Sequence, residues 1–264
     1  MTGPRTHPAP DDLFSDRLAA WREYTATPWA RIRYDVVGET LRRQCAAVRG
    51  ARGDVLRVLD VGGGDGRDAL PLALAGHDVT VVDPSAVWLD EAHGRAAAAG
   101  TRLTTVEGGL DDLPHGEWDL VLCHFVLRYR PAGADDVAAL AARVRPGGRL
   151  SVVDVNPAGR VLRALVTGGP DAAAAELRAE RAAVATFGTD ARKVDADDVV
   201  AAAGAHGLRE VARHGIRVAN DLLTDDAAKS DPAYFDALRA LELDLCDREP
   251  YRRVGFAWQV VLER

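Results

Sequence analysis

The sequence contains few cysteines, no long apolar run and no excess of positive charge. Its three cysteines, Cys45, Cys123 and Cys246, are scattered, and they show neither a disulfide framework nor the paired spacing of a metal site. This usage predicts a reducing cytoplasm. No apolar run approaches the roughly 20 residues that span a bilayer. Residues 1–12 are polar and contain prolines, so we expect neither a membrane span nor a signal peptide.

The balance of charge also limits the class of partner. With a net charge of −7, the chain as a whole does not suggest a nucleic-acid binder, although a local basic patch is compatible with that total. The histidines show no metal-ligand spacing, so we predict no metal site. The chain does have a globular composition, with 47% hydrophobic and 28% charged residues, and its 264 residues allow a sizeable core.

The most informative stretch is residues 58–66. An apolar run there leads into four glycines within five positions, and a helical pattern follows at 66–76. Glycine has no Cβ, so backbone N–H groups in such a turn can approach a ligand closely, and the next helix N-terminus favours anions. A second apolar run, 78–83, ends in Asp83, whose carboxylate suits two ribose hydroxyls. This order predicts a nucleotide-binding corner, and a tight turn without a ligand is the plainer alternative.

Strand and helix patterns alternate through the middle of the chain. Strands are predicted at 56–61, 78–83, 102–106, 118–124 and 148–154, with helices at 66–76, 85–100 and 133–145. Such alternation favours a parallel sheet with right-handed crossovers, and ligands of such sheets bind beyond the carboxyl ends of the strands. Asp83, residues 108–111 and residues 123–125 all follow strand ends, so we expect them to converge on one crevice.

Helical patterns precede this core. Residues 1–12 are predicted to be disordered, and residues 13–49 are predicted to form an N-terminal cap of two helices with a break near Pro28. An aromatic and basic cluster surrounds the break just upstream of the glycine turn, and it consists of Tyr24, Trp29, Arg31 and Arg33. This cluster either contributes to the site or is a packed helix face with solvated arginines.

The rest of the chain is predicted to complete the same sheet. The cofactor-binding core spans 50–155, and the alanine-rich residues 155–187 are predicted to be helical, inside an insertion or lid at 156–195 that lies outside the sheet. Residues 196–264 add helices at 195–206 and 232–248 and strands at 208–218 and 254–262. The predicted fold class is α/β, with a Rossmann-like, seven-stranded, mostly parallel sheet and an antiparallel C-terminal strand.

Two motifs in this pattern resemble those of a known family. They are the Asp-Val-Gly-Gly-Gly-Asp-Gly run at residues 60–66 and the Arg-Pro-Gly-Gly turn at residues 145–148. Together with the seven predicted strands, they are similar to the class I S-adenosylmethionine-dependent methyltransferases over about residues 50–264. In the Arg-Pro-Gly-Gly motif, proline at the second position and glycine at the third are typical of a type II turn.

A more specific resemblance rests on rarer segments. The triple glycine, the histidine in residues 123–127 and the segments at 215–218, 220–223, 241–243 and 248–251 resemble the bacterial tRNA 5-carboxymethoxyuridine methyltransferases. Members of that family esterify the carboxylate of a wobble uridine. The match runs with gaps from about residue 24 to residue 261, and its C-terminal segments are more diagnostic than the glycine run.

The resemblance implies S-adenosylmethionine as the cofactor. The residues that we expect to bind it are Arg33, Asp60, Gly62, Gly63, Gly64, Asp83, Gly109, Leu110 and His124. Among these, the first two glycines would meet the methionine part, the acid after the second strand would hold the ribose hydroxyls, and the residues at 109 and 110 would lie beside the adenine.

The same resemblance implies roles near the methyl group. His124 would line the methionine end, and Arg33 would reach the cofactor carboxylate, because a guanidinium can bind a carboxylate bidentately. Tyr24, Arg217 and Tyr251 are the predicted substrate residues. For the last two, the alternative is an exposed arginine and a packed tyrosine.

Whether the enzyme needs a catalytic base depends on the group that accepts the methyl. A carboxylate nucleophile with a pKa near 4 is already ionised at pH 7 and needs no base, whereas a hydroxyl or an amine would profit from one. Three interpretations of His124 remain open: a cofactor contact, a general base and simple packing. Cys123 is expected to be a buried strand cysteine and not a nucleophile.

Several functions fit these observations. The resembled family carries a lysine-rich stretch before the region equivalent to residues 191–194, whereas this chain is alanine-rich there, with charges that nearly cancel. The acceptor is therefore a tRNA or a small-molecule acid, alcohol or amine. A non-catalytic S-adenosylmethionine-binding protein is an alternative of another class. A nicotinamide-dependent oxidoreductase is disfavoured, because Arg67 stands where the spaced Gly-x-Gly-x-x-Gly motif requires glycine.

Overall fold

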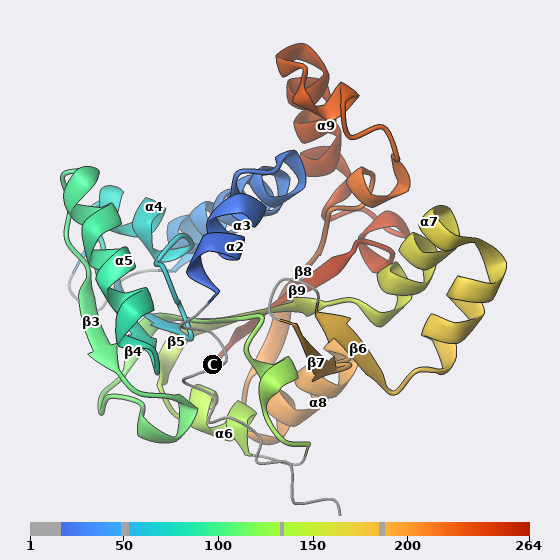
Figure 1. Ribbon diagram of the computed structural model, residues 1–264. Coiled ribbons are helices and arrows are strands. Elements are labelled where there is room, and N and C mark those ends of the chain that lie inside the picture. Colours follow the sequence, from blue (N-terminus) through green and yellow to red (C-terminus); the bar gives the residue numbers. More distant parts are fainter. Residues whose placement is uncertain (1–16, 49–52, 133–134, 185–187) are drawn as a thin grey trace, which may run out of the picture.

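The computed structural model describes residues 17–48, 53–132, 135–184 and 188–264. In these residues, seven strands form one mixed sheet in the order β3-β2-β1-β4-β5-β9-β8 (Figure 1). The strands are β1 Arg57–Val61, β2 Asp78–Asp83, β3 Thr104–Glu107, β4 Trp118–His124, β5 Val144–Val155, β8 Arg209–Ile216 and β9 Ala257–Glu263. β9 runs antiparallel to both of its neighbours, whereas β1 to β5 pair in parallel. The predicted fold class is confirmed, but the predicted tail at 1–12 lies outside the described residues.

Helices cover both faces of the sheet. Side chains on both sides of the central strands are therefore buried, and the sequences of these strands are continuous apolar runs. Figure 1 shows α3 (Pro28–Ala47), α4 (Ala69–Leu74), α5 (Ala86–Ala98) and α9 (Pro232–Leu245) on one face. The helices α6 (Asp136–Ala141) and α8 (Ala196–Ala205) lie on the other. One core cluster joins Ile32, Leu72, Leu89 and Phe235 to the first face, and a second joins Leu140 and Val199 to the opposite face.

The predicted break in the N-terminal helices is confirmed. α2 (Leu18–Thr25) ends just before Thr27, and α3 begins at Pro28. The Thr27 hydroxyl oxygen accepts a hydrogen bond from the backbone N–H of Ala30 at 3.3 Å, which caps the new helix. Proline suits the first helical position because no hydrogen bond from its nitrogen is needed there. Pro28 therefore starts a helix and does not interrupt one.

One prediction from composition is wrong. Residues 155–187 were expected to be helical throughout, but α7 (Pro157–Arg178) is followed by an antiparallel hairpin of β6 (Arg181–Val184) and β7 (Thr189–Arg192). Ala182 and Ala191 are buried opposite each other in this hairpin. Alanine favours helix locally, but burial between packed elements overrides that preference. α7 lies outside the sheet as expected (Figure 1), and a lid function for it stays a prediction.

The Arg-Pro-Gly-Gly turn lies inside β5, which begins four residues earlier than predicted. Gly147 has φ +72°, as the third residue of a type II turn requires. A Cβ on Gly148 would lie 3.0 Å from three backbone carbonyl oxygens, so only glycine fits there. The preceding helix, α6, is correspondingly shorter than the predicted 133–145. No helix in the described ranges is both long and apolar enough to cross a membrane.

Candidate active site

Backbone hydrogen bonds join the carboxyl ends of neighbouring strands, β1 to β2, β3 to β2 and β4 to β5. The N–H of Gly62 donates to the carbonyl oxygen of Val82 at 2.7 Å, and the N–H of Gly108 donates to that of Asp83 at 3.1 Å. The N–H of Phe125 donates to the carbonyl oxygen of Val153 on β5 at 2.7 Å. The loops after these strands therefore share one edge of the sheet, and the predicted convergence is confirmed.

Glycine is required in this turn both by close packing and by the left-handed backbone conformation. Gly62 and Gly64 have φ +68° and +52°, a region that residues with a Cβ rarely adopt. A Cβ on Gly62 would overlap Cγ2 of Val126, and a Cβ on Gly63 would lie 2.6 Å from Oδ2 of Asp60. The N–H groups of the four turn glycines donate within the protein, to Val82, Asp83 and Gly63, so the glycines serve close packing and leave a backbone surface without side chains that a ligand can approach.

Asp83 is oriented by the turn. Its Oδ2 accepts a hydrogen bond from the N–H of Gly64 at 2.9 Å, and its Oδ1 accepts one from the N–H of Ser85 at 3.0 Å. A carboxylate can accept roughly four hydrogen bonds, so these two orient it without exhausting its capacity. The side chain is partly exposed at the end of β2, where it can meet a ligand.

Asp60 is the buried acid beneath the turn. It is 2% exposed, and within the described residues its Oδ2 has no hydrogen-bond partner. Burial, together with the neighbouring Asp68, raises the pKa of Asp60 well above its ordinary value, and Arg33 opposes this. Such an enclosed oxygen is satisfied by an added proton, which the raised pKa favours, or by a hydrogen-bond donor from outside the protein.

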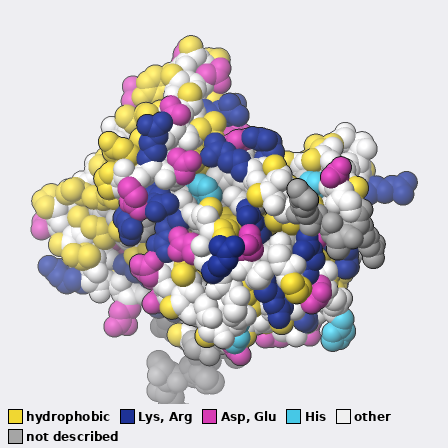
Figure 2. Space-filling model, turned by 180° about the vertical axis from the view of Figure 1, so that it is seen from behind, with side chains coloured by type: hydrophobic (Ala, Val, Ile, Leu, Met, Phe, Trp, Pro, Cys, Tyr) yellow, Lys and Arg dark blue, Asp and Glu magenta, His cyan; other side chains and the backbone are white. Residues whose placement is uncertain are grey.

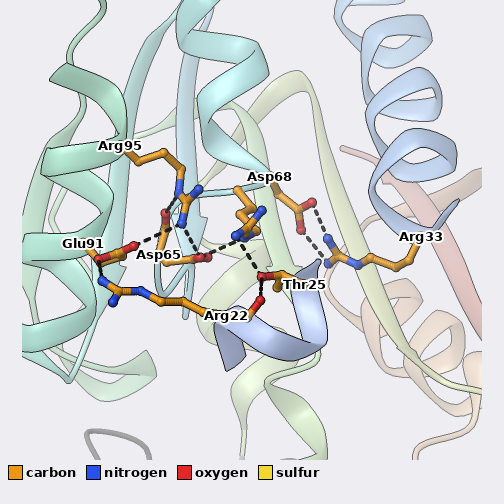
Figure 3. A network of polar contacts seen from close by, with 8 residues as sticks. Arg22, Thr25, Arg33, Asp65, Asp68, Glu91 and Arg95 are labelled. Atoms are coloured by element: carbon orange, nitrogen blue, oxygen red, sulfur yellow. Dashed lines mark hydrogen bonds and ion pairs between the residues drawn. The ribbon is translucent and has the colours of Figure 1, made fainter. Parts of the chain in front are cut away.

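A chain of buried polar groups lies beside the turn. The guanidinium of Arg33 donates to both oxygens of Asp68 at 2.6 Å (Figure 3). His124 Nδ1 is 2.8 Å from the same carboxylate, and its Nε2 is 3.0 Å from the hydroxyl of Ser151. Gln259 Nε2 donates to that hydroxyl oxygen at 3.0 Å. The chain thus links α3 and α4 to three strands of the sheet.

The hydrogen-bond partners of His124 determine which of its ring nitrogens carries the proton. Burial lowers the pKa of His124 below its ordinary value, although Asp68 opposes this. Burial also works against ionisation of Asp68, but Arg33 and His124 outweigh it and hold the pKa of Asp68 well below its usual range. Nδ1–H therefore donates to the carboxylate, and Nε2 accepts from the Ser151 hydroxyl. With both ring nitrogens occupied, His124 is better suited to positioning than to proton transfer.

A second polar network fastens α2 across the turn (Figure 3). Asp65 accepts hydrogen bonds from Arg67 and from Arg95 of α5, both at 2.9 Å. Arg67 also donates to the Thr25 hydroxyl oxygen at 2.8 Å, and Arg22 forms a 2.7 Å ion pair with Glu91 on α5. We did not predict roles for these residues, because an acid inside a glycine run carries no local signal of its distant partners.

The predicted substrate residues lie in different environments. Tyr24 on α2 is partly buried against Trp21, with ring centroids 5.4 Å apart. Arg217 follows β8 and is 3% exposed, so its interpretation as an exposed arginine is wrong. Tyr251 is 48% exposed, so its interpretation as a packed tyrosine is also wrong.

The remaining predicted residues are placed as follows. Leu110 is buried in the core as the first residue of η1 (Leu110–Asp112), and Gly109 precedes it with open space where a Cβ would lie. Cys123 is fully buried in β4, as expected, and burial raises its pKa well above the ordinary value. Across the described part of the chain, no group of three or more His, Cys, Asp or Glu side chains is arranged to hold a metal ion.

Comparison with known proteins gives this geometry a context. A family model described as "Methyltransferase domain" matches residues 58–148. The tRNA 5-carboxymethoxyuridine methyltransferase of Escherichia coli (strain K12) is 31% identical over 205 residues, which are 76% of this chain and 77% of that protein. The ubiquinone biosynthesis O-methyltransferase of Aromatoleum aromaticum is 34% identical over 103 residues, 38% of this chain and 44% of that protein.

Solved structures give the same fold. Magnesium protoporphyrin IX methyltransferase from Synechocystis, with bound SAH, superposes with a TM-score of 0.64 at 19% identity, covering 96% of this chain and 97% of that one. The family match, the extended similarity to the Escherichia coli enzyme and the shared fold agree with one another. The chain therefore belongs to the class I S-adenosylmethionine-dependent methyltransferases, with S-adenosylmethionine as its cofactor, and it is related to the tRNA 5-carboxymethoxyuridine methyltransferases.

Proposed function

We propose that this methyltransferase esterifies a carboxylate, and that its acceptor is 5-carboxymethoxyuridine at the wobble position of a tRNA. The main support is His124, which lies at the sheet edge with both ring nitrogens bound inside the protein. A carboxylate acceptor is ionised at pH 7 and needs no base, unlike a hydroxyl or an amine. The similarity to the Escherichia coli enzyme, which extends well beyond residues 58–148, supports the same acceptor.

The residues around the turn fit the cofactor. When bound, S-adenosylmethionine supplies a methyl group that its sulfonium already activates. In this proposal Gly62 and Gly63 receive its methionine part, and the orphaned oxygen of Asp60 accepts from its ammonium group. Asp83 holds the ribose hydroxyls. Arg33 keeps N–H donors beyond the two that bind Asp68, and these are available to the cofactor carboxylate.

Arg217 is the proposed acceptor-side cation. It follows β8 at the same sheet edge, and its φ of +59° is strained for a residue with a long side chain. Such strain costs about 1–3 kcal/mol and gathers at functional sites. Its guanidinium binds Asp221, and Arg163 binds the same carboxylate at 2.6 Å. Two arginines around one carboxylate form a setting in which an acceptor carboxylate can be recognised.

Asp83→Ala should weaken cofactor binding about tenfold or more, because loss of a charge-assisted hydrogen bond costs roughly 1.5–3 kcal/mol. Calorimetric titration with S-adenosylhomocysteine measures the change. Glu107→Ala is the matched control, because Glu107 is the exposed acid that pairs in register with Asp83 at the end of β3. Equal affinities for the two variants would contradict the role of Asp83.

The acceptor is tested by methyl transfer in vitro. Purified enzyme with methyl-labelled S-adenosylmethionine should label tRNA that carries 5-carboxymethoxyuridine and leave tRNA without it unlabelled. Mild alkali should release the label as methanol, because a methyl ester hydrolyses under conditions that leave methyl ethers and amines intact. Label that resists alkali, or no label on modified tRNA, would exclude this acceptor.

A small-molecule carboxylic acid is the second candidate acceptor, and the charge distribution favours it. The net charge is −7, and Lys193 and Lys229 are the only lysines in the chain. Lys and Arg side chains alternate with Asp and Glu over the face seen in Figure 2, whereas phosphate binding gains from clustered cations. Transfer to the free nucleoside at rates equal to those with tRNA would favour this candidate.

A further inference from the structure

Arg128 is a buried arginine whose partners among the described residues are weak, namely the ring of Tyr129, with its centroid 5.6 Å from Cζ, and one distant carboxylate. It lies in η2 (Leu127–Tyr129), just beyond β4, and is 7% exposed. In the part of the chain that the structure describes, its guanidinium donates no hydrogen bond, and its Nε is fully enclosed. Its one ion pair there is loose, with 3.9 Å between Nε and Oδ1 of Asp154.

The other two buried arginines differ from it in this respect. Arg33 donates two hydrogen bonds to Asp68, and Arg217 donates two to Asp221, with lengths from 2.5 to 2.7 Å. Burying a cation without such bonds is costly. Arg128 is as buried as these two arginines but lacks a bidentate carboxylate, so the cost of its burial needs another explanation.

Asp154 is not placed to supply that carboxylate. Its Oδ1 accepts from the N–H of Val155 at 2.7 Å, and its Oδ2 accepts from the backbone N–H of Arg128 at 3.2 Å. Burial raises the pKa of Asp154 to about 6, although Arg128 opposes this. Both of its oxygens are engaged by backbone N–H groups, and its distance from the guanidinium leaves Arg128 without a close counter-ion.

A second arginine adds to the local positive charge. Arg192 on β7 donates from its Nε to the carbonyl oxygens of Leu127 and Arg130, at 3.0 and 3.1 Å. These bonds hold the β6–β7 hairpin against η2, and its charge also acts on Asp154. Arg128 and Arg192 thus share one weak counter-ion.

η2, which carries Arg128, lies close to the predicted cofactor turn. Val126, just before η2, fills the space that a Cβ on Gly62 would need, so the loop packs directly on the glycine turn. Asp154 lies at the carboxyl end of β5, next to β4 in the sheet. The loop that carries Arg128 therefore contacts the glycine turn through Val126 and the carboxyl end of β5 through Asp154, whose Oδ1 is 3.9 Å from Arg128 Nε.

We propose that Arg128, supported by Arg192, binds an oxyanion of the acceptor. The ligand is a carboxylate or a phosphate oxygen pair, and a guanidinium can bind either bidentately. This inference rests on the proposed function in one respect, namely that the acceptor is acidic. The binding energy of the acceptor then compensates for the incomplete pairing of Arg128 in the free enzyme.

The test compares the full-length protein with Arg128→Met and Arg128→Lys. Methionine keeps the apolar stem and removes the charge, so the fold should be no less stable than wild type. Acceptor affinity should fall roughly ten- to hundredfold in Arg128→Met and by less in Arg128→Lys, while affinity for S-adenosylhomocysteine stays within about twofold. Arg130→Gln is the matched control, because it removes a partly exposed cation of the same loop whose partners are Asp111 and Asp136.

Two acceptor probes separate the sources of the oxyanion. The nucleoside 5-carboxymethoxyuridine offers a carboxylate without phosphate, and an anticodon stem-loop with unmodified uridine offers phosphates without the carboxylate. If Arg128→Met weakens only the nucleoside, Arg128 binds the carboxylate. If it weakens only the stem-loop, Arg128 binds a phosphate. Unchanged affinity for both would overturn the proposal.

A probe without any nucleotide distinguishes failure of this inference from failure of the proposed function. Acetate and inorganic phosphate should raise the thermal midpoint of the wild-type protein and of Arg130→Gln, but not that of Arg128→Met. If the wild type binds neither nucleotide probe and yet keeps this difference, the proposed acceptor is wrong and the oxyanion site stands. If the anions stabilise wild type and Arg128→Met equally, the site is rejected.

Discussion

Asp68→Ala should destabilise the protein by about 3–5 kcal/mol, because it leaves the buried Arg33 guanidinium without its carboxylate. The same change removes the acceptor of the His124 Nδ1–H, so two buried donors lose their partner at once. Cofactor affinity should fall as well, since both residues flank the glycine turn. Urea denaturation at pH 7 measures the stability, and calorimetry measures the affinity.

The pH dependence of this effect has a definite sign. The pKa of Asp68 is held below its ordinary value, so ionised Asp68 stabilises the fold fully above the unfolded value near 4. That stabilisation is lost as the pH falls from about 4 toward the folded pKa. The part of the stability difference between wild type and Asp68→Asn that comes from this carboxylate should therefore be fully present at pH 7, where His124 is neutral in both proteins, and should shrink below about pH 4.

A surface ion pair provides the control for Asp68. Asp35→Ala breaks the pair with Arg239, whose two side chains are exposed, and it should cost less than about 1 kcal/mol. A loss for Asp68→Ala as small as that for Asp35→Ala would show that the chain from Arg33 to Gln259 does not act as a unit.

Gly62→Ala should disrupt the cofactor turn. A left-handed residue with a Cβ costs roughly 1–2 kcal/mol, and the overlap with Cγ2 of Val126 adds about 1–3 kcal/mol of overpacking. Because the strained segment is the surface that receives the cofactor, affinity for S-adenosylhomocysteine should fall by at least about tenfold. Denaturation and calorimetry on the same preparation report both effects.

A double mutant separates the two causes. Gly62→Ala combined with Val126→Ala removes the overlap and keeps the unfavourable φ, so part of the stability should return, with a coupling of about 0.5–3 kcal/mol. Gly38→Ala in α3 is the matched control, because its new Cβ meets nothing within 4 Å and should stabilise the helix by about 0.5–1 kcal/mol. Simple additivity of the Gly62 and Val126 changes would contradict the proposed overlap.

Much of the fold could be predicted because its signals are local. The apolar runs of β1 and β4, the glycine turn and the proline at the start of α3 each reflect constraints within a few residues. The hairpin of β6 and β7 was missed for the converse reason. Its alanines favour helix in isolation, and only burial against the rest of the protein selects the extended form.

In the candidate site, too, the features that depend on local sequence could be predicted, whereas contacts between distant elements could not. Asp83 and the glycines could be named from their order along the chain, because strand, turn and acid are fixed by short-range geometry. The partners of Arg33 and of His124 could not, since Asp68 and Ser151 come from other elements. Tyr251 was grouped with Arg217 from sequence, yet one is exposed and the other buried.

Three acids near the glycine turn show which of their properties follow from the local sequence and which depend on tertiary structure. From sequence, Asp60 lies just before the last strand residue and the glycine turn, Asp65 lies within the turn and Asp68 two residues after it, because these positions are properties of the local chain. Only Asp60 was predicted to bind the cofactor, and no role was predicted for the other two. Tertiary structure left one oxygen of Asp60 without a hydrogen-bond partner among the described residues, paired Asp65 with two arginines and joined Asp68 to Arg33 and His124. An ionisable group acquires its charge and role from burial and from partners that only the folded chain brings within reach.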